Sequence, residues 1–404
     1  MPPPLLPFLF VVAVLPAAVA AASSTPDVSR RLQQRSFPAV FQAWNPIDMP
    51  AVWPLATNEG RLRAAAKHDV LWEEPVSQLG FNTPLVLGAV WDHRHGGLAT
   101  RFTPASEQQA LANRTAMLRM NPDLVFLLEV RWRDAPGSFL PEDSPFWKRQ
   151  PDGSRVLGWD NGPEPYYLLD PENPAFRANI ARQSRAALAS GVYDGVMIDW
   201  SGHLGVVQDT RAALGPDALI IVNIHDKIAD AEKYRELING SFLECNPDGP
   251  GQPTKRNGTT WDALRAGYLH MEQHLRAPRL NCLEVWGDRK DLRRMRAATT
   301  LTLTHGDGAV LFGDPNPLKT PDHLHDWYDF WDVPLGRPLG PRTDRPDGAS
   351  VREFTGGTVV YNHYRNAPAT VRFETPRRRV SDGTRGTDFT IQDADGDIFV
   401  PIPR

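Results

Sequence analysis

Residues 191–200, GVYDGVMIDW, decide the fold of the chain. An apolar run that starts after Asp194 and ends at Asp199 is typical of a parallel β-strand covered on both faces. Alternate side chains of a strand share a face, so Gly195, Met197 and Asp199 should point the same way. We therefore expect Asp194 to have a structural role at the start of a buried strand, and Asp199 to lie at its carboxyl end.

Seven further apolar runs follow the same pattern, and helical stretches separate most of them. The expected strands are residues 37–45, 83–92, 123–132, 193–200, 218–226, 240–246, 280–288 and 308–314. Helical periodicity marks residues 105–120, 175–190 and 261–275, and a proline precedes the first two. Eight such units predict an α/β fold, a (β/α)8 TIM barrel over residues 37–338. A doubly wound sheet would usually carry a Gly-rich turn after its first strand, which WNPIDMP lacks.

The pattern changes towards the carboxyl terminus. A last helix is expected in HLHDWYDFWDV, residues 323–333, and the Pro- and Gly-rich residues 335–350 are interpreted as a linker. Residues 351–404 contain short, partly alternating runs, which predict a small antiparallel β-sandwich domain. The segment DADGD, residues 393–397, resembles part of a calcium loop but is too short for an EF-hand, so we expect a hairpin turn.

The amino terminus predicts export. Residues 1–22 combine an apolar core with small residues in A-x-A order, which is typical of a secretory signal peptide, and prolines interrupt the apolar run, which argues against a membrane span. We expect a secreted or periplasmic protein. A formal net charge of −4 and a pI near 6.3 do not favour a nucleic-acid partner. The sequence leaves open the oligomeric state and whether Cys245 and Cys282 pair.

Aromatic and acidic side chains gather where the predicted strands end. Barrel enzymes place their working residues at these carboxyl ends. The residues expected there include Trp44, Trp91, Asp92, Glu129, Trp132, Asp199, Trp200, His225, Glu244, Glu284 and Trp286. Indole rings offer flat surfaces to the C–H faces of sugars, and paired carboxylates suit the hydrolysis of glycosidic bonds. The pattern therefore indicates a protein that acts on carbohydrates.

Several segments resemble glycoside-hydrolase-like (β/α)8 families with a C-terminal β-domain. YDGVMIDW (193–200) resembles their fourth-strand motif, NGSFLECNP (239–247) their sixth-strand segment, and REFTGGTVVYN (352–362) the start of their small β-domain. FGDP, followed by HDWYDFWDVPLGRPLG, resembles their barrel exit. The layout is also similar to α-galactosidase-type barrels, where an Asp closing strand four is the nucleophile and an acid closing strand six is the acid/base. The resemblance implies these roles for Asp199 and Glu244, with Glu in place of Asp on strand six.

The resulting hypothesis is a secreted glycoside hydrolase that acts on an oligosaccharide or polysaccharide. Asp199 is its nucleophile or base, Glu244 its general acid, and Glu284 the competing candidate for that acid. The residues expected to bind substrate are Trp44, Trp91, Asp92, Glu129, Trp200, His225 and Trp286. This mechanism requires no cofactor and no metal. The sugar, the linkage and the stereochemical outcome stay open.

Two alternatives remain at this point. A non-catalytic carbohydrate-binding barrel would keep the tryptophans but lack a second carboxylate at working distance from Asp199. A metal-dependent hydrolase could use His93 and His95 of WDHRH together with His225 and Asp314, although these residues match the usual ligand pattern poorly.

Overall fold

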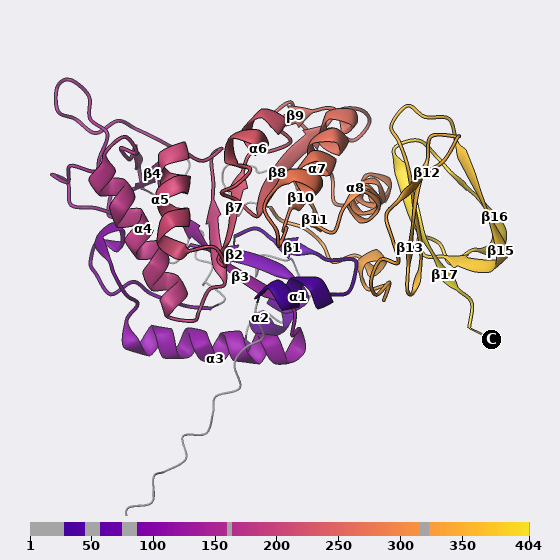
Figure 1. The fold of residues 1–404 in the computed structure, drawn as a ribbon, viewed down its shortest axis with the longest axis horizontal. Coiled ribbons are helices and arrows are strands. Elements are labelled where there is room, and N and C mark those ends of the chain that lie inside the picture. Colours follow the sequence, from indigo (N-terminus) through magenta and orange to yellow (C-terminus); the bar gives the residue numbers. More distant parts are fainter. Residues whose placement is uncertain (1–27, 45–56, 75–86, 160–163, 315–322, 404) are drawn as a thin grey trace, which may run out of the picture.

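The computed structural model describes residues 28–44, 57–74, 87–159, 164–314 and 323–403 (Figure 1). Eight parallel strands form a near-closed barrel, so the predicted fold class is confirmed. In spatial order they are β1 (Phe41–Gln42), β2 (Val70–Glu73), β3 (Val125–Val130), β6 (Gly195–Ile198), β7 (Leu219–Asn223), β8 (Gly240–Pro247), β10 (Cys282–Trp286) and β11 (Ala309–Gly313). A parallel bridge between Val40 and Val310 brings the last strand back to the first.

Helices and short loop strands surround this barrel. The helices are α1 (Val28–Gln34), α2 (Asn58–Ala65), α3 (Pro104–Met120), α4 (Pro174–Ala189), α5 (Leu204–Leu214), α6 (Ile228–Tyr234), α7 (Trp261–His274) and α8 (Leu292–His305), with 3-10 turns at Gly96–Leu98 and Asp329–Trp331. The loop strands are β4 (Asp134–Pro136), β5 (Tyr166–Leu168) and β9 (Gly258–Thr259). The helices predicted over 105–120, 175–190 and 261–275 are confirmed as α3, α4 and α7.

Two predicted elements are wrong. The second barrel strand is β2, which pairs with β1 and β3, whereas residues 87–92 lie outside the barrel sheet and residues 83–86 lie outside the described part. β2 has only four residues and includes the buried Glu73, so it does not form the long apolar run by which the other strands were predicted. The helix expected over 323–333 is only a 3-10 turn, because His323 has a left-handed backbone (φ 61°) and burial alternates along the segment.

The amino-terminal end of the barrel is tied together by polar residues that precede four strands. These are Asp69, Asp194, Asn239 and Asn281, whose side chains accept hydrogen bonds of 2.8–3.0 Å from the N–H groups of Val40, Phe126, Ile220 and Ser241. Asp194 also forms buried ion pairs with Arg31 and Arg114, which confirms its structural role. The glycine after Asn239 is required, because a Cβ on Gly240 would lie 1.8 Å from the carbonyl oxygen of Leu280.

A six-stranded antiparallel sheet follows the barrel. Its order is β12 (Thr343–Asp344), β13 (Ser350–Phe354), β14 (Gly357–Asn362), β17 (Asp395–Pro401), β15 (Ala369–Arg379) and β16 (Arg385–Ile391). The sheet curls around a small apolar core of Ala349, Val360, Ala369, Val371, Phe389, Ile391 and Phe399. β12 lies inside the segment interpreted as a linker. Helix α8 packs against both the barrel strand β11 and the strand β17, and it lies between the two sheets (Figure 1).

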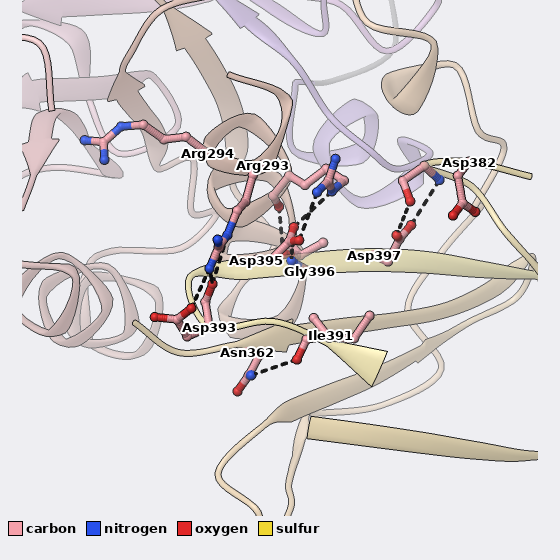
Figure 2. Close-up of polar contacts among 12 residues, drawn as sticks. Arg293, Arg294, Asn362, Asp382, Ile391, Asp393, Asp395, Gly396 and Asp397 are labelled. Carbon is pink, nitrogen blue, oxygen red and sulfur yellow. Dashed lines mark hydrogen bonds and ion pairs between the residues drawn. The ribbon is translucent and has the colours of Figure 1, made fainter. Parts of the chain in front are cut away.

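The segment DADGD spans the end of the turn after β16 and the first residues of β17, and it faces helix α8 (Figure 2). The turn is not the expected hairpin, because β15 lies between β16 and β17 in the sheet. Arg293 donates to both the carbonyl oxygen and the side chain of Asp393. Arg296 binds the carboxylate of Asp395 through two hydrogen bonds of 2.9 Å each. These aspartates therefore join the β-domain to the barrel.

Two further observations concern the expectations about export and cysteines. No helix in the described part of the chain has the length and apolar character of a membrane span, and the expected signal peptide, residues 1–22, lies outside that part. Cys245 and Cys282 are both buried, free thiols. They lie on neighbouring strands, but Cys245 is opposite Val285, three residues further along β10 than Cys282.

Asp194→Ala should destabilise the fold by about 3–5 kcal/mol, because it leaves two buried arginines without their shared carboxylate. Urea unfolding followed by circular dichroism would measure this free energy. Glu59→Ala is the matched control, since its ion pair with Arg63 is exposed and should contribute less than about 1 kcal/mol. Equal losses in the two variants would contradict the structural role of Asp194.

Candidate active site

A cavity of about 310 Å³ opens at the carboxyl ends of the barrel strands. It is lined by Trp44, Glu129, Arg131, Trp132, Arg133, Asp134, Trp159, Asp199, Trp200, Ser201, Asn223, His225, Glu244, Arg256, Asn257 and His323. Its size is in the range of pockets for small ligands. Six of the ten predicted site residues lie in this lining, namely Trp44, Glu129, Asp199, Trp200, His225 and Glu244.

Asn223 holds two of the predicted carboxyl groups together. Its Nδ2 donates to Oδ1 of Asp199 at 2.8 Å and to Oε2 of Glu244 at 2.9 Å. Asp199 directly follows β6, Asn223 is the last residue of β7, and Glu244 lies within β8, two residues beyond Phe242, which is opposite Asn223. The parallel register of these neighbouring strands brings the three side chains together. Since both bonds share one nitrogen, the two carboxyl oxygens lie within about 6 Å of each other, near the separation found in retaining glycosidases.

The carboxyl group of Glu244 has a raised pKa. Burial raises the pKa of its carboxyl group to about 8, and the neighbouring charges of Asp199 and Glu284 act in the same direction, while His323 opposes them. Most Glu244 side chains are therefore protonated at neutral pH. The backbone of Glu244 is also fixed, because its carbonyl oxygen lies 2.7 Å from Nδ1 of His225.

Glu284 lies beside Glu244 but below the cavity. The two residues are direct neighbours in the register of β8 and β10. Glu284 is fully buried, and both of its carboxyl oxygens lie 2.9 Å from Nδ1 of His323. Glu284 is therefore bound to the ring of a pocket residue and does not itself line the pocket.

Glu129, at the end of β3, is a third acid in the lining. Burial raises the pKa of its carboxyl group to about 8, and the charges of Glu74 and Asp199 also raise it, whereas Arg131 lowers it. The indole Nε1 of Trp44 donates a hydrogen bond to Oε2 of Glu129. The side chain is thus held in place whether or not a ligand is present.

Unusual backbone conformations are concentrated at the cavity. Eight described residues other than glycine have a positive φ, and six of these line the pocket, namely Trp44, Trp200, Ser201, His225, Asn257 and His323. Such conformations cost energy and persist where the surrounding structure enforces them, which is often at a functional site. The wall of the cavity is therefore shaped by backbone strain on five different loops or strand ends.

The tryptophans of the pocket have different environments. Trp44 is almost fully buried and stacks on His323, with ring centroids 5.0 Å apart. Trp132 donates from Nε1 to the carbonyl oxygen of Asp199 at 2.8 Å. Trp200 is 39% exposed, so its ring is the one that offers the most surface to a ligand.

Three predicted binding residues are not brought to the cavity. Trp91 stacks on Phe102 and Asp92 pairs with Arg101, since their segment is not the second barrel strand. Trp286 does close β10 as expected, but it is completely buried. These positions are corrections to the predicted substrate-binding set.

Several residues of the lining were not among the predicted binding residues. They are Arg131, Arg133, Asp134, Trp159, Arg256, Asn257 and His323. The run RWRD, residues 131–134, follows the third strand directly, so the strand-end rule would have found it. No comparable signal marks Trp159, Arg256, Asn257 or His323, whose places depend on the loops.

One group of side chains in the described part of the chain has the spacing of metal ligands. Ligand atoms of Glu244, Glu284 and His323 lie within 4.8 Å of one another. In this structure Nδ1 of His323 lies 2.9 Å from both carboxyl oxygens of Glu284, so these residues form a hydrogen-bonded cluster. His93 and His95, considered above as ligands, instead contact each other and the carbonyl oxygen of Ser138.

Comparison with known proteins gives structural likeness only. No family model and no curated protein matches the sequence. An α-amylase from Malbranchea cinnamomea matches 93% of this chain and 97% of its own, with TM-score 0.55 and 12% identity. An α-amylase from Lactobacillus plantarum matches 93% and 100%, with TM-score 0.53 and 10% identity. The chain shares the overall fold of these two proteins. At these identities the likeness concerns the barrel with its C-terminal β-domain.

Glu129→Gln should stabilise the protein at pH 9 more than at pH 5. The folded wild type keeps a proton on Glu129 up to about pH 8, whereas an ordinary Glu releases it near 4.5, so wild-type stability falls as pH rises between these values. Gln keeps the acceptor for Trp44 and does not titrate. Thermal unfolding from pH 5 to 9 measures the difference, with the exposed Glu59→Gln as control. A constant difference across this range would exclude a raised pKa at Glu129.

Proposed function

We propose that the protein is a glycoside hydrolase in which Asp199 is the nucleophile and Glu244 the general acid and base. The observation that carries this proposal is the shared amide of Asn223, which brings the two carboxyl groups to one point of the cavity. The fold of the α-amylases supports the same class of reaction. The Geobacillus thermoleovorans α-amylase, solved with acarbose, has TM-score 0.50 and 12% identity, and it covers 89% of this chain.

The two acids would act in sequence. Glu244 donates its proton to the glycosidic oxygen as the bond to the anomeric carbon breaks, and Asp199 attacks that carbon to form a covalent glycosyl ester. The Glu244 carboxylate then accepts a proton from a water molecule whose oxygen attacks the anomeric carbon. The ester bond to Asp199 breaks, which releases the sugar and regenerates the Asp199 carboxylate and protonated Glu244. Asn223 donates to both side chains and would keep them oriented through the two steps.

The remaining groups would bind the sugar. Trp200 offers an exposed ring for a C–H face, and His225 and Glu129 supply polar groups at the cavity wall. Together with residues 1–22, this supports an exported enzyme acting on an oligosaccharide or polysaccharide. A carbohydrate-binding barrel without activity is the alternative, and it gives no reason for Asn223 to hold two acids together.

Asp199→Asn should abolish sugar release, because the amide cannot form the glycosyl ester. Glu244→Gln should reduce kcat/KM by about 100- to 10,000-fold on natural linkages, but much less on 2,4-dinitrophenyl glycosides, whose leaving group needs no proton. Reducing-sugar release from a panel of oligosaccharides and polysaccharides measures both. Undiminished turnover by Asp199→Asn would exclude its assignment.

Three controls make this test specific. Asp217→Asn removes an exposed carboxylate just before β7, at the opposite end of the barrel, and should keep full activity. Glu284→Gln tests the competing acid, and a selective loss on poor leaving groups there would transfer the acid role from Glu244. A parallel set with EDTA tests the metal alternative, which loss of activity would favour. Glycan binding without any turnover by wild type would favour the non-catalytic barrel.

The reaction should retain the configuration of the anomeric carbon. The two oxygens bound by Asn223 lie within about 6 Å of each other, which is closer to the roughly 5–5.5 Å carboxyl separation of retaining enzymes than to the roughly 6.5–9.5 Å of inverting enzymes. Proton NMR of the first product formed would measure its configuration before mutarotation. An inverted product would mean that Asp199 acts as a base on water.

A further inference from the structure

Of the three arginines that line the cavity, Arg256 alone has no acidic partner among the described residues. Arg131 pairs with Glu74 at 2.7 Å, and Arg133 pairs with Asp134 at 2.8 Å. Arg256 is exposed, and its guanidinium forms no ion pair within the described part of the chain. It therefore brings to the cavity a positive charge that no described side chain neutralises.

The position of Arg256 is fixed by the end of strand β8. The buried Asn246, two residues after Glu244, donates from its backbone N–H to the carbonyl oxygen of Asn257 at 2.9 Å and from its side chain to that of Arg256 at 3.1 Å. The guanidinium carbon lies 5.9 Å from the ring centre of Trp286, within cation–π range. The backbone of Arg256 is thus fixed at the cavity by β8, the strand that also carries Glu244.

A second guanidinium lies at the cavity. Arg133 stacks over the exposed ring of Trp200, 3.8 Å from its centre. It uses Nη1 to bind Asp134, and its other donors have no hydrogen-bond partner among the described residues. The guanidinium of Arg133 therefore covers one face of the Trp200 ring and places a positive charge beside it.

The charge of the lining supports the same conclusion. Burial raises the pKa of both Glu129 and Glu244 to about 8, so these two acids are mostly uncharged at neutral pH. Among the other acids and the arginines of the lining, Arg131 pairs with Glu74 and Arg133 with Asp134, which leaves Arg256 to balance Asp199. A cavity that contains four acidic residues is therefore not an anionic cavity at pH 7.

We propose that the sugar bound at this site carries an anionic group, most simply the carboxylate of a hexuronic acid, which Arg256 binds with help from Arg133. A guanidinium binds a carboxylate through two parallel N–H···O bonds, so it selects the acid over the matching neutral sugar. A sulfate ester offers similar acceptors, and the experiment distinguishes the two. The proposal rests on the function proposed above, because it specifies the substrate of the same site.

Binding can be measured without catalysis by isothermal titration of wild type with sodium glucuronate, sodium galacturonate, glucose, galactose and glucose 6-sulfate. We expect a uronate to bind about 10-fold or more tightly than its neutral counterpart, and the preference to weaken with added NaCl. Arg256→Gln should remove this preference, and Arg256→Lys should keep part of it. Arg372→Gln is the matched control, because it removes an exposed arginine from β15.

Hydrolysis of matched p-nitrophenyl glucuronides, galacturonides, glucosides and galactosides gives the second readout. Cleavage of a uronide that falls about 10-fold or more in Arg256→Gln and is unchanged in Arg372→Gln would support the proposal. Tighter binding of glucose 6-sulfate than of either uronate would support the anionic site and identify a sulfated sugar. Equal or better binding and cleavage of the neutral sugars would overturn the anionic substrate but leave the hydrolase intact. Absence of both binding and cleavage across all these compounds, with Asp199→Asn identical to wild type, would overturn the hydrolase as well.

Discussion

The site depends on one constraint, which is that four acidic side chains converge in the upper part of an apolar barrel. Glu129, Asp199, Glu244 and Glu284 come from four strands, β3, β6, β8 and β10. Like charges this close and this buried cannot all be ionised, so protons and hydrogen bonds have to be distributed among them. Burial accordingly raises the pKa values of Glu129 and Glu244, while Glu284 contacts the ring of His323.

Buried polar groups have different roles at the two ends of the barrel. At the amino-terminal end Asp194 binds two arginines and one backbone N–H, so its role is to join α1, α3 and β3. At the carboxyl end, Oδ1 of Asn223 is buried in the lining of the cavity without a hydrogen-bond partner in the described structure. Positive φ angles are gathered at this end too. The lower end therefore stabilises the fold, and the upper end holds groups that a ligand can satisfy.

The fold was predictable where strands are long and apolar, because periodicity reports burial on both faces. β3 and β7 are of this kind, whereas β2, with its buried Glu73, is not. The acids Asp199 and Glu244 could be predicted because strand order alone brings strand ends together. Residues such as Arg256 could not, since the position of a loop side chain depends on contacts, here those of Asn246, that no sequence period encodes.

The glutamate on strand six, where the α-galactosidase-type layout has aspartate, has a structural reason in this chain. Asn223 stands between Asp199 and Glu244, so the acid on β8 must extend far enough to reach the same nitrogen that binds Asp199. The longer side chain makes that contact at 2.9 Å. The same amide thus supplies a donor to the proposed nucleophile, while burial and two neighbouring acids keep a proton on its partner. The asparagine donates to both carboxyl groups alike and lowers the pKa of Glu244, so burial and the neighbouring acids are the causes that raise it.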